Sequence, residues 1–273
     1  MPFLDINDIC LHFEQHSAAR SEAPERPPLL MLSGMASDSA SWLPLVDGLR
    51  QQQSLLIPDN RCTGRTGSGS VASSRDVMIA DILAMLDALG IERVNVLGHS
   101  MGGMLGWALA CQAPERVSRL VCAAALPQII PARIALFQSL LAMRTEDNEA
   151  HWFALLYQFL FRPEFFADPD AVAAALEASL AYPYKQNLTA FGQQVDALPS
   201  FLPPLPLAQR RCPVTLLTGS QDMLMTPQML FDFRQQHPDV TVQIVDGAAH
   251  ALHWEQAGRV LAIVEDALSR PLD

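Results

Sequence analysis

Short, wholly apolar runs alternate with segments of helical periodicity along most of the chain. The apolar runs have the length and composition of buried strands, and they cover residues 29–32, 55–57, 94–97 and 120–123. The segments between them repeat apolar residues on one helical face, over residues 39–49, 75–89 and 103–111. Residues 3–13 alternate more loosely, as two short antiparallel strands would. This order predicts an α/β fold with a doubly wound, mostly parallel sheet.

The pattern changes at Pro127. From there to about residue 207 the periodicity is helical alone, and the strand–helix alternation then resumes at 214–218, 229–236, 240–245 and 254–268. We therefore divide the chain into a first core segment (1–126), an inserted all-helical lid (127–207) and a second core segment (208–273). The aromatic residues crowded into the insert are expected to pack on the core and also to line an apolar site.

Composition and charge argue against several classes of partner. The formal net charge is −11, with 18 basic and 29 acidic residues and no basic cluster, so we expect neither nucleic acid nor an anionic membrane as a partner. No apolar run approaches the ~20 residues that span a bilayer, and residues 1–10 lack the basic residue of a secretory signal. The five cysteines are scattered, which predicts free thiols, no metal site and, by default, a cytoplasmic location. The sequence does not indicate an oligomeric state.

The junction between the run 94–97 and the helix 103–111 holds the motif Gly98-His99-Ser100-Met101-Gly102. A serine at the apex of a strand–turn–helix needs small residues on both sides, because strand and helix close on each other there. The turn also places the serine at a helix N-terminus, where backbone N–H groups favour a developing oxyanion. The motif predicts that Ser100 is a nucleophile, and the alternative is an ordinary turn whose serine caps the helix.

A nucleophilic serine needs a base, and the base needs a carboxylate that orients it. Asp222 follows the run 214–218, and His250 follows the run 240–245. Because the carboxyl ends of parallel strands gather at one edge of a sheet, Ser100, Asp222 and His250 are expected to converge there as catalytic residues.

Other residues compete for these roles. His253 lies one helical turn beyond His250 and is the alternative base. Asp246 is the alternative acid, but it lies too close in sequence to His250 to orient it comfortably, and a turn or cap role suits it better. His99 neighbours the serine but points the other way along the backbone, which indicates a structural role.

With these motifs in place, the chain resembles the α/β-hydrolase superfamily, in the lid-bearing branch that holds esterases, enol-lactonases, C–C bond hydrolases and iminopeptidases. The resemblance covers nearly the whole chain and rests on four segments, Gly98-His99-Ser100-Met101-Gly102-Gly103, Gly219-Ser220-Gln221-Asp222, Gly247-Ala248-Ala249-His250 and the loop 59–66. It implies eight strands, mostly parallel, and no cofactor.

The same resemblance implies an oxyanion hole made of the backbone N–H groups of Met35 and Met101. We expect the substrate to contact one loop residue and three aromatic residues of the insert, namely Gly34, Trp152, Phe153 and Tyr157.

Two positions depart from the family pattern. Ser33 stands where the family usually has histidine before the glycine of the oxyanion loop, so the hydrogen bonding that stiffens this loop must differ. Cys62 stands where the family's Asp-x-Arg-Gly-x-Gly-x-Ser loop has its first glycine, which alters the expected shape of that loop. Neither departure removes a catalytic group.

The resemblance implies acyl transfer to water from a small-molecule substrate. The aromatic and aliphatic insert, with few basic residues, favours an uncharged or weakly charged, small to medium, mainly apolar acyl group of a carboxylic ester. Lactone hydrolysis and C–C cleavage on the same three residues stay open. A substrate with a carboxylate would need an arginine in the pocket, and the insert contains Arg133, Arg144 and Arg162. A hypothesis from another class is a low-turnover ligand receptor built on this fold.

Overall fold

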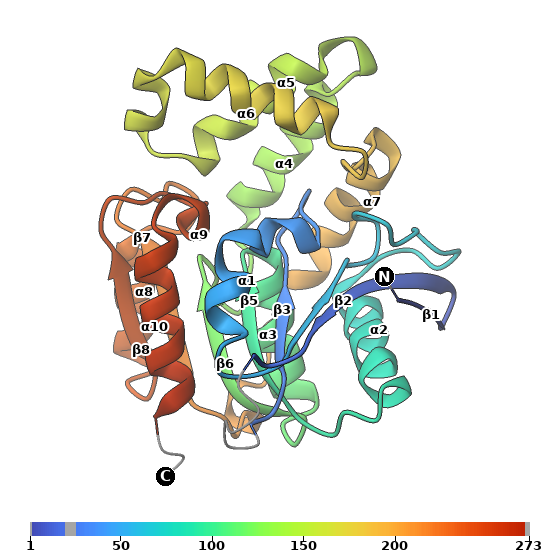
Figure 1. Ribbon diagram of the computed structural model, residues 1–273, viewed down its shortest axis with the longest axis vertical. Helices are drawn as coiled ribbons and strands as arrows, with labels where there is room; N and C mark the ends of the chain where they lie inside the picture. The colour runs from blue at the N-terminus through green and yellow to red at the C-terminus, as the bar shows by residue number, and fades with distance from the viewer. Residues whose placement is uncertain (1, 20–25, 271–273) are drawn as a thin grey trace.

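The computed structural model describes residues 2–19 and 26–270; residues 1, 20–25 and 271–273 of the two predicted core segments lie outside the described ranges. Eight strands of the described chain form one sheet, in the order β1-β2-β4-β3-β5-β6-β7-β8 (Figure 1). Strand β2 pairs antiparallel with β1 and β4, and the other pairings are parallel. The strands are β1 (Phe3–Ile6), β2 (Ile9–His16), β3 (Leu29–Leu32), β4 (Leu55–Pro58), β5 (Val94–His99), β6 (Val117–Ala123), β7 (Val214–Gly219) and β8 (Thr241–Val245). The prediction of an eight-stranded, mostly parallel sheet is confirmed.

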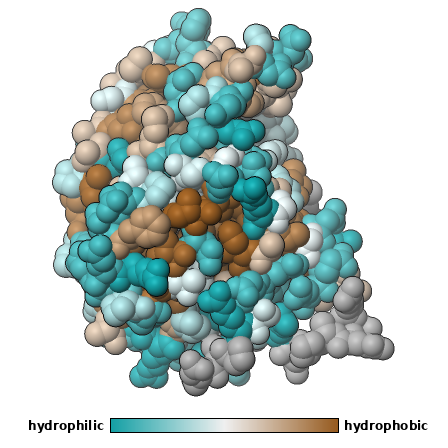
Figure 2. Space-filling view, turned by 90° about the vertical axis from the view of Figure 1, so that its left-hand side faces the viewer, coloured by the Kyte–Doolittle hydropathy of each residue, from teal (hydrophilic) through white to brown (hydrophobic). Residues whose placement is uncertain are grey.

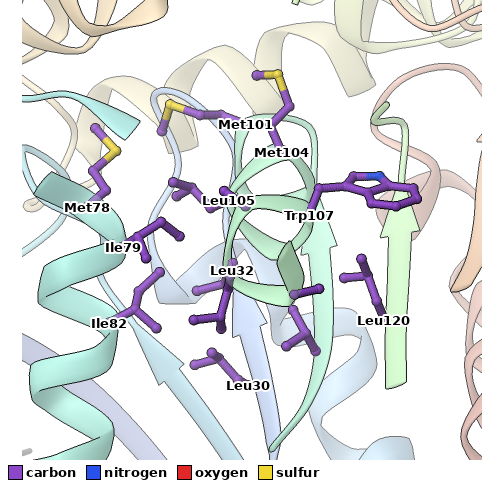
Figure 3. Close-up of a cluster of buried hydrophobic side chains, with 14 of the residues drawn as sticks. Leu30, Leu32, Met78, Ile79, Ile82, Met101, Met104, Leu105, Trp107 and Leu120 are labelled. Carbon is purple, nitrogen blue, oxygen red and sulfur yellow. The ribbon is translucent and has the colours of Figure 1, made fainter. Parts of the chain in front are cut away.

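Helices cover both faces of this sheet. One apolar cluster packs α2, α3 and α8 against one face, and Figure 3 shows part of it, with side chains of α2 and α3 directed toward the strands. A second cluster packs α1 and α10 against the opposite face. The bounds are α1 (Leu43–Leu49), α2 (Arg75–Ala88), α3 (Met101–Gln112), α8 (Pro227–Gln236), α9 (Leu252–Glu255) and α10 (Ala257–Ser269).

Strand β3 shows why the predicted strands are wholly apolar. Leu30 and Leu32 belong to the cluster beneath α2 and α3, whereas Leu29 and Met31 belong to the cluster beneath α1 and α10. Successive side chains of a strand point to opposite faces, and both faces are covered here. Every position of β3 is therefore buried, and the helical period appears only in the segments between strands.

Between β6 and β7 the chain forms helices and no strand. These are α4 (Pro131–Met143), α5 (Glu149–Leu160), α6 (Pro169–Ala181) and α7 (Leu188–Ala197), joined by short 3-10 helices. In Figure 1 α4, α5 and α6 lie at one end of the molecule, and α4, α5 and α7 share an apolar cluster that includes Trp152 and Phe191. The division of the chain at residues 126 and 207 into core and lid stays a prediction.

Two helical segments differ from the helices that the periodicity predicts. The segment predicted at 39–49 begins as a 3-10 helix, Ser39–Trp42, before α1. The segment predicted at 254–268 breaks at Gln256, between α9 and α10. At this break Gln256 contacts the turn that follows β8: its Nε2 donates a hydrogen bond to the Gly247 carbonyl oxygen at 3.1 Å.

Candidate active site

Ser100 lies between β5 and α3 with φ 52° and ψ −120°. This conformation is unfavourable for a residue with a Cβ atom and costs about 1–3 kcal/mol. The turn is tight because its glycines touch backbone: a Cβ atom on Gly98 would lie 2.3 Å from the Gly102 carbonyl oxygen, and one on Gly102 would lie 2.0 Å from the Leu32 carbonyl oxygen. Only glycine fits at both positions, as the motif predicts.

Three predicted side chains meet where the strands end. Ser100 Oγ lies 3.0 Å from His250 Nε2, and His250 Nδ1 lies 2.9 Å from Asp222 Oδ2. Asp222 follows β7 and His250 follows β8, and the two residues are only 2% and 3% exposed. The structure therefore brings Ser100, His250 and Asp222 together in the hydrogen-bonding order that nucleophile, base and orienting carboxylate require.

The Asp222 carboxylate is fixed by its surroundings. Oδ1 accepts hydrogen bonds from the backbone N–H groups of Leu224 at 2.7 Å and Met225 at 2.9 Å. Oδ2 accepts from Thr218 Oγ1 at 3.0 Å as well as from His250. These donors hold the carboxylate in one orientation. A carboxylate accepts only, so Nδ1 of His250 carries the proton and Nε2 faces Ser100 as an acceptor.

Two further histidines pack behind His250. His99 Nε2 donates to the His250 carbonyl oxygen at 2.9 Å, and the His99 ring lies 4.6 Å from that of His253. Burial, together with neighbouring histidines, lowers the pKa of His99 well below its usual range and the pKa of His253 to about 3. His253 packs against Trp42 in a tilted arrangement, with ring centroids 5.1 Å apart. These contacts favour His250 over His253 as the base and give His99 the predicted structural role.

The alternative acid, Asp246, has a different environment from Asp222. Its side chain is exposed, and it accepts a hydrogen bond from Ser220 Oγ at 3.4 Å. An exposed carboxylate is mobile and solvated, whereas an orienting carboxylate must be held. The geometry therefore favours Asp222.

The two residues whose backbone N–H groups are expected to bind an oxyanion both line the cavity that contains Ser100. Met101 is the first residue of α3, and Met35 lies in the turn that follows β3. Neither N–H donates to another group in the described part of the chain. A Cβ atom on Gly34 would lie 3.2 Å from Ser100 Cβ, so the predicted contact residue Gly34 is directly beside the serine.

Gln194, a residue that the sequence patterns above do not indicate, holds the turn that carries Met35. Its fully buried side chain extends from α7; Oε1 accepts from the backbone N–H of Ala36 at 3.3 Å, and Nε2 donates to the Arg61 carbonyl oxygen at 3.2 Å. Gln194 occupies a buried face of α7 that is otherwise apolar. A polar residue within an apolar stripe is the sequence signal that could have indicated it.

The two departures from the family pattern are accommodated locally. Ser33 Oγ donates to the Asp38 carbonyl oxygen at 2.8 Å, and Asn60 Nδ2 donates to the Ser33 carbonyl oxygen at 2.9 Å. These bonds stiffen the loop in place of the family's histidine. Cys62 has φ +68°, in the left-handed region that favours glycine. The loop therefore keeps a conformation suited to the family's glycine although the residue is cysteine.

A narrow cavity, partly open to solvent, adjoins Ser100 and His250. Its lining is mainly apolar and includes Met104, Ile129, Phe137, Leu198, Met225 and Met229. Besides Ser100 and His250, its polar side chains are Gln128 and Arg133. Figure 2 shows hydrophobic surface gathered in the middle of the face where β7 and α8 lie, surrounded by hydrophilic side chains.

The aromatic residues predicted to bind substrate do not line this cavity. Trp152 is 2% exposed and donates its indole N–H to the Leu140 carbonyl oxygen at 2.9 Å. Tyr157 donates its hydroxyl to the Ala175 carbonyl oxygen at 2.9 Å. Trp152 packs against α4 and α7, and Tyr157 packs against α6; the expected contact of these residues with substrate stays a prediction. Phe153 lines a second cavity, with Ala36, Tyr182, Tyr184 and Trp254 among its neighbours.

In the described ranges, no group of three or more His, Cys, Asp or Glu side chains is arranged to hold a metal ion, and the cysteines there are free thiols. No helix within those ranges is long and apolar enough to cross a bilayer.

Comparison with known proteins defines the class. The model of the alpha/beta hydrolase fold family matches residues 27–257, so the chain belongs to the α/β-hydrolase fold family. It is 27% identical over 252 residues to the protein named "Putative carbamate hydrolase RutD" of Azorhizobium caulinodans, with 92% of each chain covered.

Solved structures of low identity share the fold. One is MGS-M2, an α/β hydrolase enzyme from a Medee basin deep-sea metagenome library, with a TM-score of 0.85, 15% identity and coverage of 100% of this chain and 99% of that one. Another is the enol-lactonase from Burkholderia xenovorans LB400, with a TM-score of 0.81, 19% identity and coverage of 98% and 100%.

Proposed function

We propose that this chain is a serine hydrolase that cleaves carboxylic esters with a small to medium, mainly apolar acyl group. One observation carries the proposal: Ser100 Oγ, His250 and Asp222 form a hydrogen-bonded series, with distances of 3.0 and 2.9 Å, at the wall of a mainly apolar cavity. Membership of the α/β-hydrolase fold family supports it.

In the acylation step, Ser100 Oγ attacks the ester carbonyl carbon while His250 Nε2 takes the hydroxyl proton. The N–H groups of Met35 and Met101 stabilise the oxyanion that forms, and each lowers the activation free energy by about 3 kcal/mol. The C–O bond to the alcohol then breaks, and His250 gives its proton to the departing oxygen. Asp222 stabilises the imidazolium in between and keeps Nε2 directed at Ser100.

In the deacylation step, His250 takes a proton from a water molecule that attacks the acyl-Ser100 carbonyl. The second tetrahedral intermediate uses the same two N–H groups. Its collapse breaks the bond to Ser100 Oγ, which recovers its proton from His250, and the carboxylic acid leaves. The site is thereby regenerated with no net consumption of a protein group.

A carbamate is the second candidate substrate class. The specific reason is the 27% identity to a protein named as a carbamate hydrolase, over 92% of the chain. A carbamate presents the same kind of carbonyl carbon to Ser100. The same three residues would also act on enol-lactones and on compounds with a cleavable C–C bond next to a carbonyl.

The test is hydrolysis of p-nitrophenyl esters of increasing acyl length by the full chain. We expect a burst of p-nitrophenol followed by steady turnover, and labelling of Ser100 by a fluorophosphonate. Ser100→Ala should lower kcat by about 10⁶-fold, whereas Ser139→Ala, on the exposed side of α4, should leave it unchanged.

Unchanged hydrolysis by Ser100→Ala would overturn the proposal. Labelling of Ser100 without turnover of any ester would mean that the substrate class is a carbamate, a lactone or a compound cleaved at a C–C bond, and not an ester. Labelling with slow turnover and a ligand-dependent change in the α4–α7 helices would favour the receptor hypothesis instead.

A further inference from the structure

Arg133 is the one guanidinium among the lining residues of the cavity that contains Ser100. It lies in the first turn of α4 and is partly buried. Its Nε donates to the Leu224 carbonyl oxygen at 3.0 Å, and its Nη2 donates to the Met223 carbonyl oxygen at 2.7 Å. These bonds hold the guanidinium in one place and leave Nη1 without a protein acceptor in the described part of the chain.

The charge of Arg133 has no counter-charge among the described residues. No carboxylate of the described residues lies within the 4.0 Å of an ion pair with it. The other two arginines of the predicted lid differ: Arg144 pairs with Glu149 at 3.1 Å, and Arg162 pairs with Glu255 at 3.8 Å. Main-chain carbonyls satisfy N–H groups but are electrically neutral, so they fix the position of Arg133 without neutralising it.

Helix stability does not account for this arginine. The N-terminal end of a helix carries partial positive charge, so a cation in the first turn is unfavourable there. The first turn of α4 also holds no acidic residue to offset it. A partly buried cation that main-chain carbonyls hold at the wall of a mainly apolar cavity is an arrangement that an anionic group on a ligand completes.

We propose that the substrate carries a carboxylate, apart from the carbonyl that Ser100 attacks, and that this carboxylate pairs with Arg133. The substrate class is therefore an acyl compound with an apolar middle and a free carboxylate, such as a half-ester of a dicarboxylic acid. This inference rests on the proposed serine hydrolase function. The protein's net charge of −11 would repel anions in general, so a preference for an anionic ester must come from a local site.

The test compares monomethyl and dimethyl esters of dicarboxylic acids of four to eight carbons, a matched anionic and neutral series. Hydrolysis is followed by chromatography, with Ser100→Ala as the background. The variants are Arg133→Met, which removes the charge, and Arg133→Lys, which keeps it. Arg234→Met, an exposed site on α8, makes the same change in net charge away from the cavity.

We expect the unmodified chain to have a higher kcat/KM for a monomethyl ester than for the dimethyl ester of the same acid, at one chain length at least. Arg133→Met should lower kcat/KM for that monoester by about 10–100-fold, mainly through KM, and should change the value for the dimethyl ester by less than about three-fold. Arg133→Lys should be intermediate, and Arg234→Met should behave as the unmodified chain.

If Arg133→Met lowered kcat/KM equally for both esters, the inference would be overturned, because Arg133 would then serve only to bind α4 to residues 223–224. The inference also fails, alone, if dimethyl esters are hydrolysed and no monoester is preferred. If no ester is hydrolysed and Ser100 does not react with a fluorophosphonate, both the proposed function and this inference fail. Should Arg133→Met not fold, the free dicarboxylates are tested as inhibitors of dimethyl ester hydrolysis by the unmodified chain, and an absence of inhibition overturns the inference.

Discussion

Ser100 allows backbone strain to be measured separately from catalysis. Its φ of 52° and ψ of −120° suit glycine better than a residue with a Cβ atom. Ser100→Ala keeps the Cβ atom, and with it the strain, but removes the Oγ atom that lies 3.0 Å from His250 Nε2. Ser100→Gly removes both. Neither variant retains a nucleophile, so the two differ only in the Cβ atom.

Two opposing effects set the difference in unfolding free energy between these variants. Removing the Cβ atom relieves strain of about 2 kcal/mol. Glycine also gives the unfolded chain more conformational freedom, which costs about 0.5–1 kcal/mol. We therefore expect Ser100→Gly to be more stable than Ser100→Ala by about 1 kcal/mol. At the unstrained, exposed Ala174 of α6 the order should reverse, with Ala174→Gly losing about 1 kcal/mol.

Urea and thermal unfolding followed by circular dichroism measure both comparisons. The expected advantage of Ser100→Gly over Ser100→Ala corresponds to about 2–3 °C in Tm. Neither variant should hydrolyse esters or react with a fluorophosphonate. If Ser100→Ala were as stable as Ser100→Gly, or more so, while Ala174→Gly showed its normal loss, the turn would not be strained and the reasoning would be refuted.

Three further perturbations follow from the structure. Gly102→Ala places a Cβ atom 2.0 Å from a carbonyl oxygen of β3 and should cost about 3 kcal/mol or more and most of the activity, whereas Gly258→Ala, with open space around it, should not lower Tm. The pKa of His253 is about 3 in the folded protein, so as pH falls below about 6.5 the unfolded chain binds a proton at His253 that the folded chain does not. The unfolding free energy should therefore decline by up to about 1.4 kcal/mol per pH unit. His253→Phe should remove this part of the pH dependence, measured by urea titrations at several pH values. Gln194→Leu leaves the N–H of Ala36 unpaired and should lower both kcat and the unfolding free energy, the latter by about 2 kcal/mol, whereas an unchanged kcat would show that the turn after β3 does not depend on α7.

The sheet could be predicted because its central strands are buried on both faces. In β3 every position is apolar for that reason, and the helical period appears only where one face is exposed. The break at Gln256 could not be predicted in the same way. It depends on hydrogen bonds to the turn at Gly247, a contact between side chain and backbone that hydrophobic periodicity does not encode.

The convergence of Ser100, Asp222 and His250 could be predicted because it is a property of topology, since each follows a strand of the same parallel sheet. The lining of the cavity is a property of packing. Aromatic residues mark a buried face of a helix, but they do not say which neighbour covers it, and Trp152 is covered by the helices of its own region, where its indole N–H bonds to Leu140.

The helices between β6 and β7 are connected to the loops that hold the proposed site. Gln194 on α7 binds the turn that carries Met35, and Arg133 on α4 binds the carbonyls directly after Asp222. A displacement of α4 or α7 would therefore move an oxyanion donor or the orienting carboxylate, besides changing the cavity. It follows that substitutions in α7 made to alter substrate preference will also alter kcat unless they preserve the hydrogen bonds of Gln194.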